Sequence, residues 1–126
     1  MKAEFLTPLR TEKLDSKFYE LLSPLRYYSK LCYENIIVPE GFVTDFASVP
    51  RVPLAYLLCG NTAHRAAVVH DYLYRQGWKR DIADRVLYEA CRATGMSWWR
   101  SRLIYTAVRI CGWACYTPLP GVLDPR

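Results

Sequence analysis

A histidine, two aspartates and a tyrosine have the residue types and spacing for acid–base chemistry. They are His70, Asp71 and Tyr74 in one run, with Asp84 a short way further along the chain. A carboxylate on one imidazole nitrogen fixes the tautomer and raises the basicity of the ring, so that the other nitrogen can take a proton from water. We therefore expect His70 to act as a general base oriented by Asp84.

The neighbouring carboxylate, Asp71, suggests a cation. It lies about 100° around a helix from His70, where it would face the adjoining groove. A carboxylate there can hold a hard cation such as calcium beside the activated water. The sequence thus predicts Asp71 as a calcium ligand.

Two predicted helices would position these residues. The first runs from a cap at Asn61 or Thr62 to about Gln76 and is stopped by Gly77. The second, capped by Asp81, runs to about Thr94 with Gly95 past its end, and a third runs from Ser97 to about Tyr116. A short apolar helix is also predicted at 52–58.

An antiparallel pairing of the first two long helices would bring His70 and Asp84 together. At a rise of about 1.5 Å per residue, they lie about 9 Å and about 6 Å from the turn. With axes about 8–10 Å apart, the two side chains can meet directly. The alternative is that Asp81 and Asp84 form a capping box, in which case Asp84 only satisfies its own helix start.

A second acid, Asp45, lies in the polar segment 44–51 between the predicted strands and helices. Asp45 can complete a metal site, or it can orient His70 in place of Asp84. The alternative is that Thr44, Asp45 and Ser48 bond local backbone amides and build a tight turn.

The first half of the chain reads as strands separated by turns. Predicted strands at 18–22 and 25–31 flank Ser23-Pro24, and those at 34–38 and 42–44 flank 39–41. We predict a single α+β domain over 1–126: a small N-terminal antiparallel sheet, β-rich over 1–50, packed on a bundle of three main helices. The helical part covers 51–117 and an extended tail covers 118–126.

Composition limits the classes of function. The hydrophobic content of 52% is that of a globular protein, and the net charge of +5 comes from scattered basic residues, so no specific nucleic-acid signal is present. The start of the chain lacks the apolar stretch of a signal peptide, and Arg109, Pro118 and Pro120 interrupt the most apolar region, so no transmembrane segment is predicted. We expect synthesis in a host cytoplasm, with incorporation in a virion as a further possibility.

The cysteines and tryptophans carry weaker signals. Five cysteines without a CxxC pair argue against a disulfide framework and favour core packing. The run Trp98-Trp99-Arg100 can mark a lipid or partner surface, with core or rim packing as the alternative.

Longer motifs resemble a known family. The run VPEGFVTDFASVPR at 38–51, AAVVHDYLYR at 66–75, Ala83-Asp84 and a late aromatic helix together resemble a family of short proteins of unknown function that recurs in tailed phages and prophages. The resemblance extends from about Tyr27 to Trp113. It implies a phage setting, with other virion proteins as partners.

A second resemblance is local and implies an activity. His70-Asp71-x-x-Tyr74 with Asp84 on an antiparallel helix is similar to the catalytic core of phospholipase A2. The resemblance implies that His70 is the base for water, that Asp71 binds calcium, and that Tyr74 and Asp84 support the histidine. The glycine-rich calcium loop of that family is absent here, and Val69 and Leu73 replace its flanking cysteines.

Three functions follow as hypotheses. The first is a phage-encoded hydrolase acting on esters or phospholipids, for which anionic lipid would be a partner. The second is a non-catalytic tail, baseplate or assembly protein in which the same residues are structural. The third is a small protein that binds a host factor.

Overall fold

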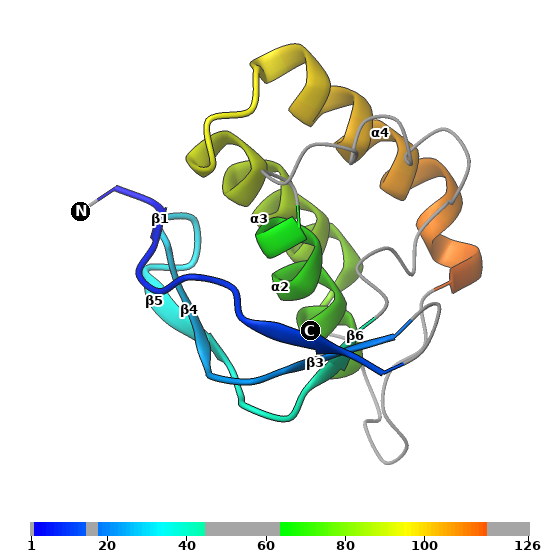
Figure 1. Cartoon of the computed structure of the whole chain (residues 1–126). Helices are drawn as coiled ribbons and strands as arrows, with labels where there is room; N and C mark the ends of the chain where they lie inside the picture. Colours follow the sequence, from blue (N-terminus) through cyan, green and yellow to red (C-terminus); the bar gives the residue numbers. More distant parts are fainter. Residues whose placement is uncertain (1, 15–17, 45–63, 116–126) are drawn as a thin grey trace.

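The computed structural model describes residues 2–14, 18–44 and 64–115, without the side chains of 111–115. Strands come first and helices follow (Figure 1), so the predicted α+β class is confirmed. The strands are β1 (Glu4–Phe5), β2 (Thr11–Lys13), β3 (Tyr19–Leu21), β4 (Leu25–Ser29), β5 (Glu34–Val38) and β6 (Val43–Thr44). The helices are α2 (His64–Arg75), α3 (Arg80–Ala93) and α4 (Trp98–Cys115).

The strands divide into two antiparallel sheets of three strands instead of forming one. One sheet has the order β1-β4-β5 and the other has the order β2-β3-β6. Ser23-Pro24 joins β3 to β4, yet these two strands belong to different sheets. The third strand of each sheet, β1 or β2, was not predicted, because two or three residues are too few to show an alternating pattern.

One face of the β4–β5 strand pair forms part of the hydrophobic core. Leu25 pairs with Val38 and Tyr27 pairs with Ile36, and all four side chains are buried. Their neighbours Arg26 and Ile37 point to solvent, as expected for strands with one face on a core. The buried face packs on apolar residues of α2 and α3, which include Val68, Val69, Leu73, Ala83, Val86 and Ala90.

The helix ends agree with most of the sequence signals. Gly77 and Gly95 follow α2 and α3 with positive φ angles of 79° and 95°, as predicted for residues that stop helices. Ser97 precedes α4, and its carbonyl accepts a hydrogen bond from Ser101 N at 3.0 Å. The prediction that Asp81 caps α3 is wrong: the helix begins at Arg80, Lys79 is its N-cap residue, and Asp81 accepts from Ile82 N inside the first turn.

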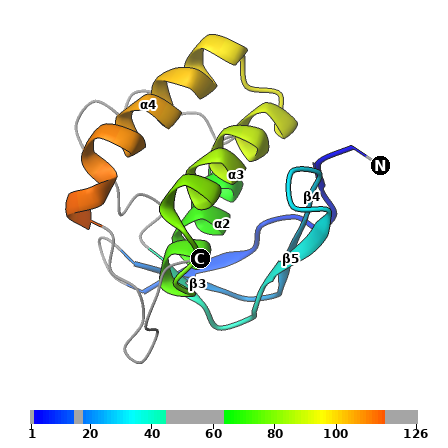
Figure 2. The same ribbon diagram turned by 180° about the vertical axis from the view of Figure 1, so that it is seen from behind.

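Helix α3 lies at the centre of the helical layer. It contacts α2 on one side, α4 on the other, and strands β1 and β4. Figures 1 and 2 show from opposite sides that α4 lies on the outside of this layer, away from β4 and β5. Among the described helices, none has both the length and the hydropathy needed to cross a bilayer.

Several predictions fall outside the described residues. Among them are the short helix at 52–58, the first helix's start at Asn61 or Thr62, and the tail at 118–126. The predicted end of the third helix near Tyr116 also lies beyond the last described residue.

Candidate active site

His70 and Asp84 are in direct contact. His70 comes from α2 and Asp84 from α3, and His70 Nε2 lies 2.7 Å from Asp84 Oδ1. Both side chains are buried, with 2% of His70 and none of Asp84 exposed. The contact predicted from the antiparallel pairing of these helices is therefore present.

Two further side chains hold the same carboxylate. The Tyr74 hydroxyl donates to Asp84 Oδ1 at 2.6 Å, and Arg109 on α4 donates through a guanidinium nitrogen to Oδ2 at 3.0 Å. The rings of His70 and Tyr74 lie 4.2 Å apart, one helical turn from each other. Asp84 thus connects three helices, which is more than satisfying its own helix start, so the capping-box alternative does not describe its role.

Sequence reasoning missed Arg109. The only signal was a basic residue inside an otherwise apolar helical stretch, which we took as an interruption of a hydrophobic run. The structure gives it a partner across the α3–α4 contact. Arg80 adds to this joint, because its guanidinium donates to the backbone carbonyl of Arg109 at 3.1 Å.

The electrostatics of the cluster fix which groups carry charge. Burial acts to raise the pKa of the Asp84 carboxyl, but hydrogen bonding and charge from His70, helped by Tyr74 and Arg109, outweigh it and lower the pKa. Burial and the hydrogen bond to Asp84 raise the pKa of Tyr74 well above its ordinary value. Asp84 is therefore an ionised acceptor, and Tyr74 is a neutral donor to it.

Asp71 lies next to His70 in the chain but has a different neighbour. Its Oδ1 atom lies 3.5 Å from Nε of Arg75, one turn further along α2. Within 2–14, 18–44 and 64–115, no group of three or more His, Cys, Asp or Glu side chains could hold a metal ion. Calcium can also be held by backbone carbonyls, so calcium binding by Asp71 stays a prediction, and no step below uses a cation.

Asp45 is outside the described residues, as is most of the 44–51 segment. Thr44, at the end of β6, is buried. The structure therefore places Asp84 against His70 and says nothing of Asp45 as a second orienting acid.

Glu89 forms a second acidic centre that sequence reasoning missed. Its Oε1 atom accepts from the Tyr27 hydroxyl at 2.6 Å and from the Ser29 hydroxyl at 2.9 Å, while Oε2 accepts from Leu31 N at 2.8 Å. These bonds tie α3 to the β4–β5 hairpin. Both carboxylate oxygens of Glu89 are engaged in these bonds, so we assign Glu89 to structure and not to chemistry.

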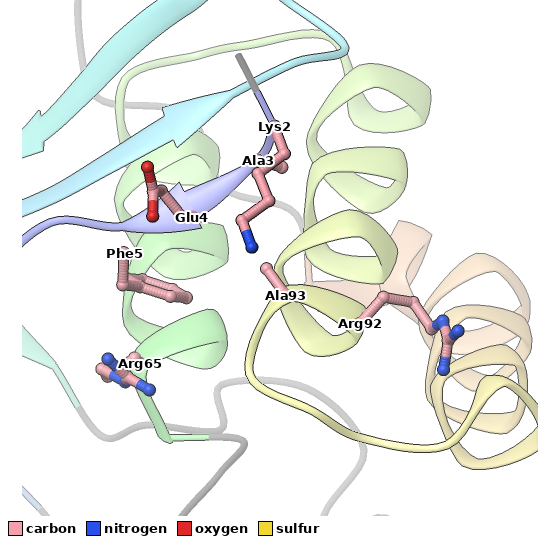
Figure 3. Close-up of a pocket in the computed structure, with 7 residues that line it drawn as sticks. All are labelled: Lys2, Ala3, Glu4, Phe5, Arg65, Arg92 and Ala93. Carbon is pink, nitrogen blue, oxygen red and sulfur yellow. The ribbon is translucent and has the colours of Figure 1, made fainter.

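A cavity of about 380 Å³ lies between the N-terminal strand and the ends of α2 and α3. Figure 3 shows that its basic residues do not converge, with the Arg92 guanidinium turned away from Lys2 and Glu4. Arg92 donates to Met96 O at 2.7 Å, and the Arg65 guanidinium stacks 4.7 Å from the centre of the Phe5 ring. Both guanidinium groups are used by the fold, so we assign no chemistry to this cavity.

The fold and the site define a small α+β protein with a buried histidine–aspartate pair held between helices. The chain belongs to a family of unknown function (DUF1353), which matches residues 19–108 and so includes the whole pair. The expected membership in a family of unknown function is thereby confirmed. Comparison with curated proteins found no match, and comparison with solved structures found none.

Proposed function

We propose that the protein is a hydrolase in which His70 is the general base for an attacking water. The observation that carries this proposal is the 2.7 Å contact between His70 Nε2 and an Asp84 carboxylate that Tyr74 and Arg109 also hold. A histidine whose acid partner is itself fixed by further donors is oriented before substrate arrives. General-base catalysis requires this orientation together with access of water to the other ring nitrogen.

The reaction assigns a role to each ring nitrogen. His70 donates its Nε2 hydrogen to the ionised Asp84, which leaves the lone pair of Nδ1 to accept a proton. Water attacks the ester carbonyl carbon as its proton passes to Nδ1, and the same proton then goes to the departing alkoxide. One water and one ester give an acid and an alcohol. Between the two steps, the negative charge of Asp84 stabilises the imidazolium form of His70.

The substrate class and setting are part of the proposal. Carboxylic esters, phospholipids among them, are the substrates implied by the local similarity to phospholipase A2. The long motifs support a phage-encoded protein that is made in the host cytoplasm and enters the virion. Mass spectrometry of purified particles would test that setting directly.

One observation favours a non-catalytic alternative. Only 2% of the His70 side chain is exposed, and Asp84 joins three helices. A sealed histidine–acid pair can serve only to fix helix packing. The protein would then be a tail, baseplate or assembly protein in which the cluster is a structural joint.

Two substitutions at His70 separate these functions. In His70→Gln the amide nitrogen reaches about as far as Nε2 and can still donate to Asp84, but the side chain cannot take a proton. His70→Ala removes both properties. Each protein is assayed for fatty-acid release from phospholipid vesicles and for hydrolysis of a soluble short-chain ester, with calcium and with a chelator, alongside its melting temperature.

The hydrolase proposal expects His70→Gln to keep the wild-type melting temperature and to lose activity by about 100-fold or more. The structural alternative expects no hydrolysis by any of the three proteins, and a lower melting temperature only in His70→Ala. Wild-type protein that hydrolyses neither substrate under either condition would contradict the proposal.

A further inference from the structure

The outer face of α4 carries an exposed apolar stripe. Trp99, Leu103 and Ile110 are exposed by 52%, 48% and 65%, and with the exposed Thr106 they recur every three or four residues. The opposite face of the same helix, with Ile104 and Val108, is buried against the core. The stripe spans about 16 Å at a rise of about 1.5 Å per residue.

The charges on α4 are all of one sign. The helix carries Arg100, Arg102 and Arg109 and has no aspartate or glutamate. Arg109 is bonded to Asp84, whereas the side chain of Arg102 is exposed beside the stripe. An apolar face bordered by an exposed arginine, on a helix without acidic residues, is complementary to an anionic surface with an apolar interior.

A basic hollow adjoins the stripe on its α3 side. It has a volume of about 220 Å³ and is lined, among the described residues, by Arg85, Tyr88, Arg102 and Tyr105. The two tyrosine rings meet edge to face with centroids 6.2 Å apart. Arginine guanidinium groups and tyrosine hydroxyls are hydrogen-bond donors that can bind a phosphate group.

We propose that the outer face of α4 docks on an anionic phospholipid bilayer. The stripe enters the boundary between headgroups and acyl chains, where tryptophan is favoured, and the hollow holds a lipid phosphate between Arg85 and Arg102. Figures 1 and 2 show α4 at the outside of the helical layer, away from β4 and β5. This inference concerns binding alone and holds whether or not His70 is catalytic.

A second copy of the chain fits this face less well than a bilayer does. A twofold contact brings the same surface patch together on both copies, so each residue meets its own equivalent region. On α4 that would bring the exposed Arg102 of each copy toward a helix that carries no aspartate or glutamate. A membrane rich in phosphate supplies that negative charge.

The experiment measures co-sedimentation with phosphatidylcholine vesicles, alone and with about one-third phosphatidylglycerol. Leu103→Glu/Ile110→Glu tests the stripe. Its matched control is Leu22→Glu/Ile37→Glu, with the same residue types, similar exposures of 51% and 45%, and no position on α4. Arg85→Gln/Arg102→Gln tests the hollow, and Arg10→Gln/Arg26→Gln, also exposed, is its control.

We expect the wild-type protein to bind the anionic vesicles, with affinity falling as salt rises. The stripe variant and the hollow variant should each lose at least about tenfold in affinity for the anionic vesicles, while both controls bind like wild type. His70→Gln should also bind like wild type, so that a failure of catalysis and a failure of docking are distinguished.

Three results would overturn the proposal. The wild-type protein fails to bind the anionic vesicles, or the controls lose as much affinity as the test variants. In the third, light scattering shows a concentration-dependent dimer that Leu103→Glu/Ile110→Glu dissociates without weakening vesicle binding, which would assign the face to self-association. Circular dichroism confirms that each variant is folded before binding is compared.

Discussion

The side chains of His70 and Tyr74 meet at a single atom, Oδ1 of Asp84, at 2.7 Å and 2.6 Å. They come from successive turns of α2, so one face of that helix presents both groups to one carboxylate on α3. Two donors on one oxygen fix the position of the carboxylate more tightly than either does alone. Tyr74 is therefore a positioning residue for the pair.

Removing the Tyr74 hydroxyl tests that role. Tyr74→Phe should lower the free energy of unfolding by about 2 kcal/mol, because it deletes a buried hydrogen bond to a charged acceptor. Urea unfolding gives the measurement. Tyr72→Phe is the matched control, since the Tyr72 ring is only partly buried and packs edge-on against Phe42; an equal loss in that variant would contradict the assignment.

The lowered pKa of Asp84 predicts a pH dependence of stability. An acid whose pKa is lower in the folded state stabilises the fold above its unfolded pKa, and that contribution is lost as the pH falls through the folded pKa. Wild type should therefore be more stable than Asp84→Asn by about 3 kcal/mol at neutral pH, with the difference shrinking below about pH 4. Denaturation midpoints measured from pH 7 to acid give the curve for each protein, and a constant difference would contradict the assignment.

How much of the candidate site the sequence predicted depended on how far apart its contacting residues lie along the chain. His70 and Asp84 lie on two helices joined by a short turn, so the helical rise and an antiparallel pairing of the helices predicted their contact. Arg109 was missed because it reaches Asp84 from α4, and the packing angle of a third helix cannot be read from periodicity. Glu89 was missed for the same reason, since its donors lie on the β4–β5 hairpin, about 60 residues away.

The fold, too, could be predicted from the sequence only where the interacting residues lie close together in the chain. Gly77 and Gly95 marked helix ends correctly because a stop signal acts on its immediate neighbours. The division of the strands into two sheets depends on which distant strands pair. Neither β1 nor β2 is long enough to show an alternating pattern in the sequence. Asp81 was predicted as a cap because aspartate is a good capping residue, yet α3 begins at Arg80, so Asp81 lies inside its first turn.

The bonds to Glu89 predict that this residue secures the β4–β5 hairpin. Glu89→Gln keeps one oxygen acceptor but replaces the other with an amide that cannot accept from Leu31 N, so we expect a loss of about 2 kcal/mol in unfolding free energy. Hydrogen exchange at the Leu31 amide should also accelerate. Glu12→Gln, at an exposed position of β2, is the control and should leave both quantities unchanged.

Gly95 predicts a cost that comes from the backbone and not from packing. Its φ angle is +95°, and a Cβ added there would meet no atom within 4 Å, so a side chain has room but the backbone conformation is strained. Gly95→Ala should lower the free energy of unfolding by about 1 kcal/mol, seen as a drop of about 4 °C in melting temperature. Gly95→Asn should lose less, because asparagine tolerates positive φ better than alanine. If asparagine cost as much as alanine, or if alanine cost nothing, the turn between α3 and α4 would not depend on this conformation.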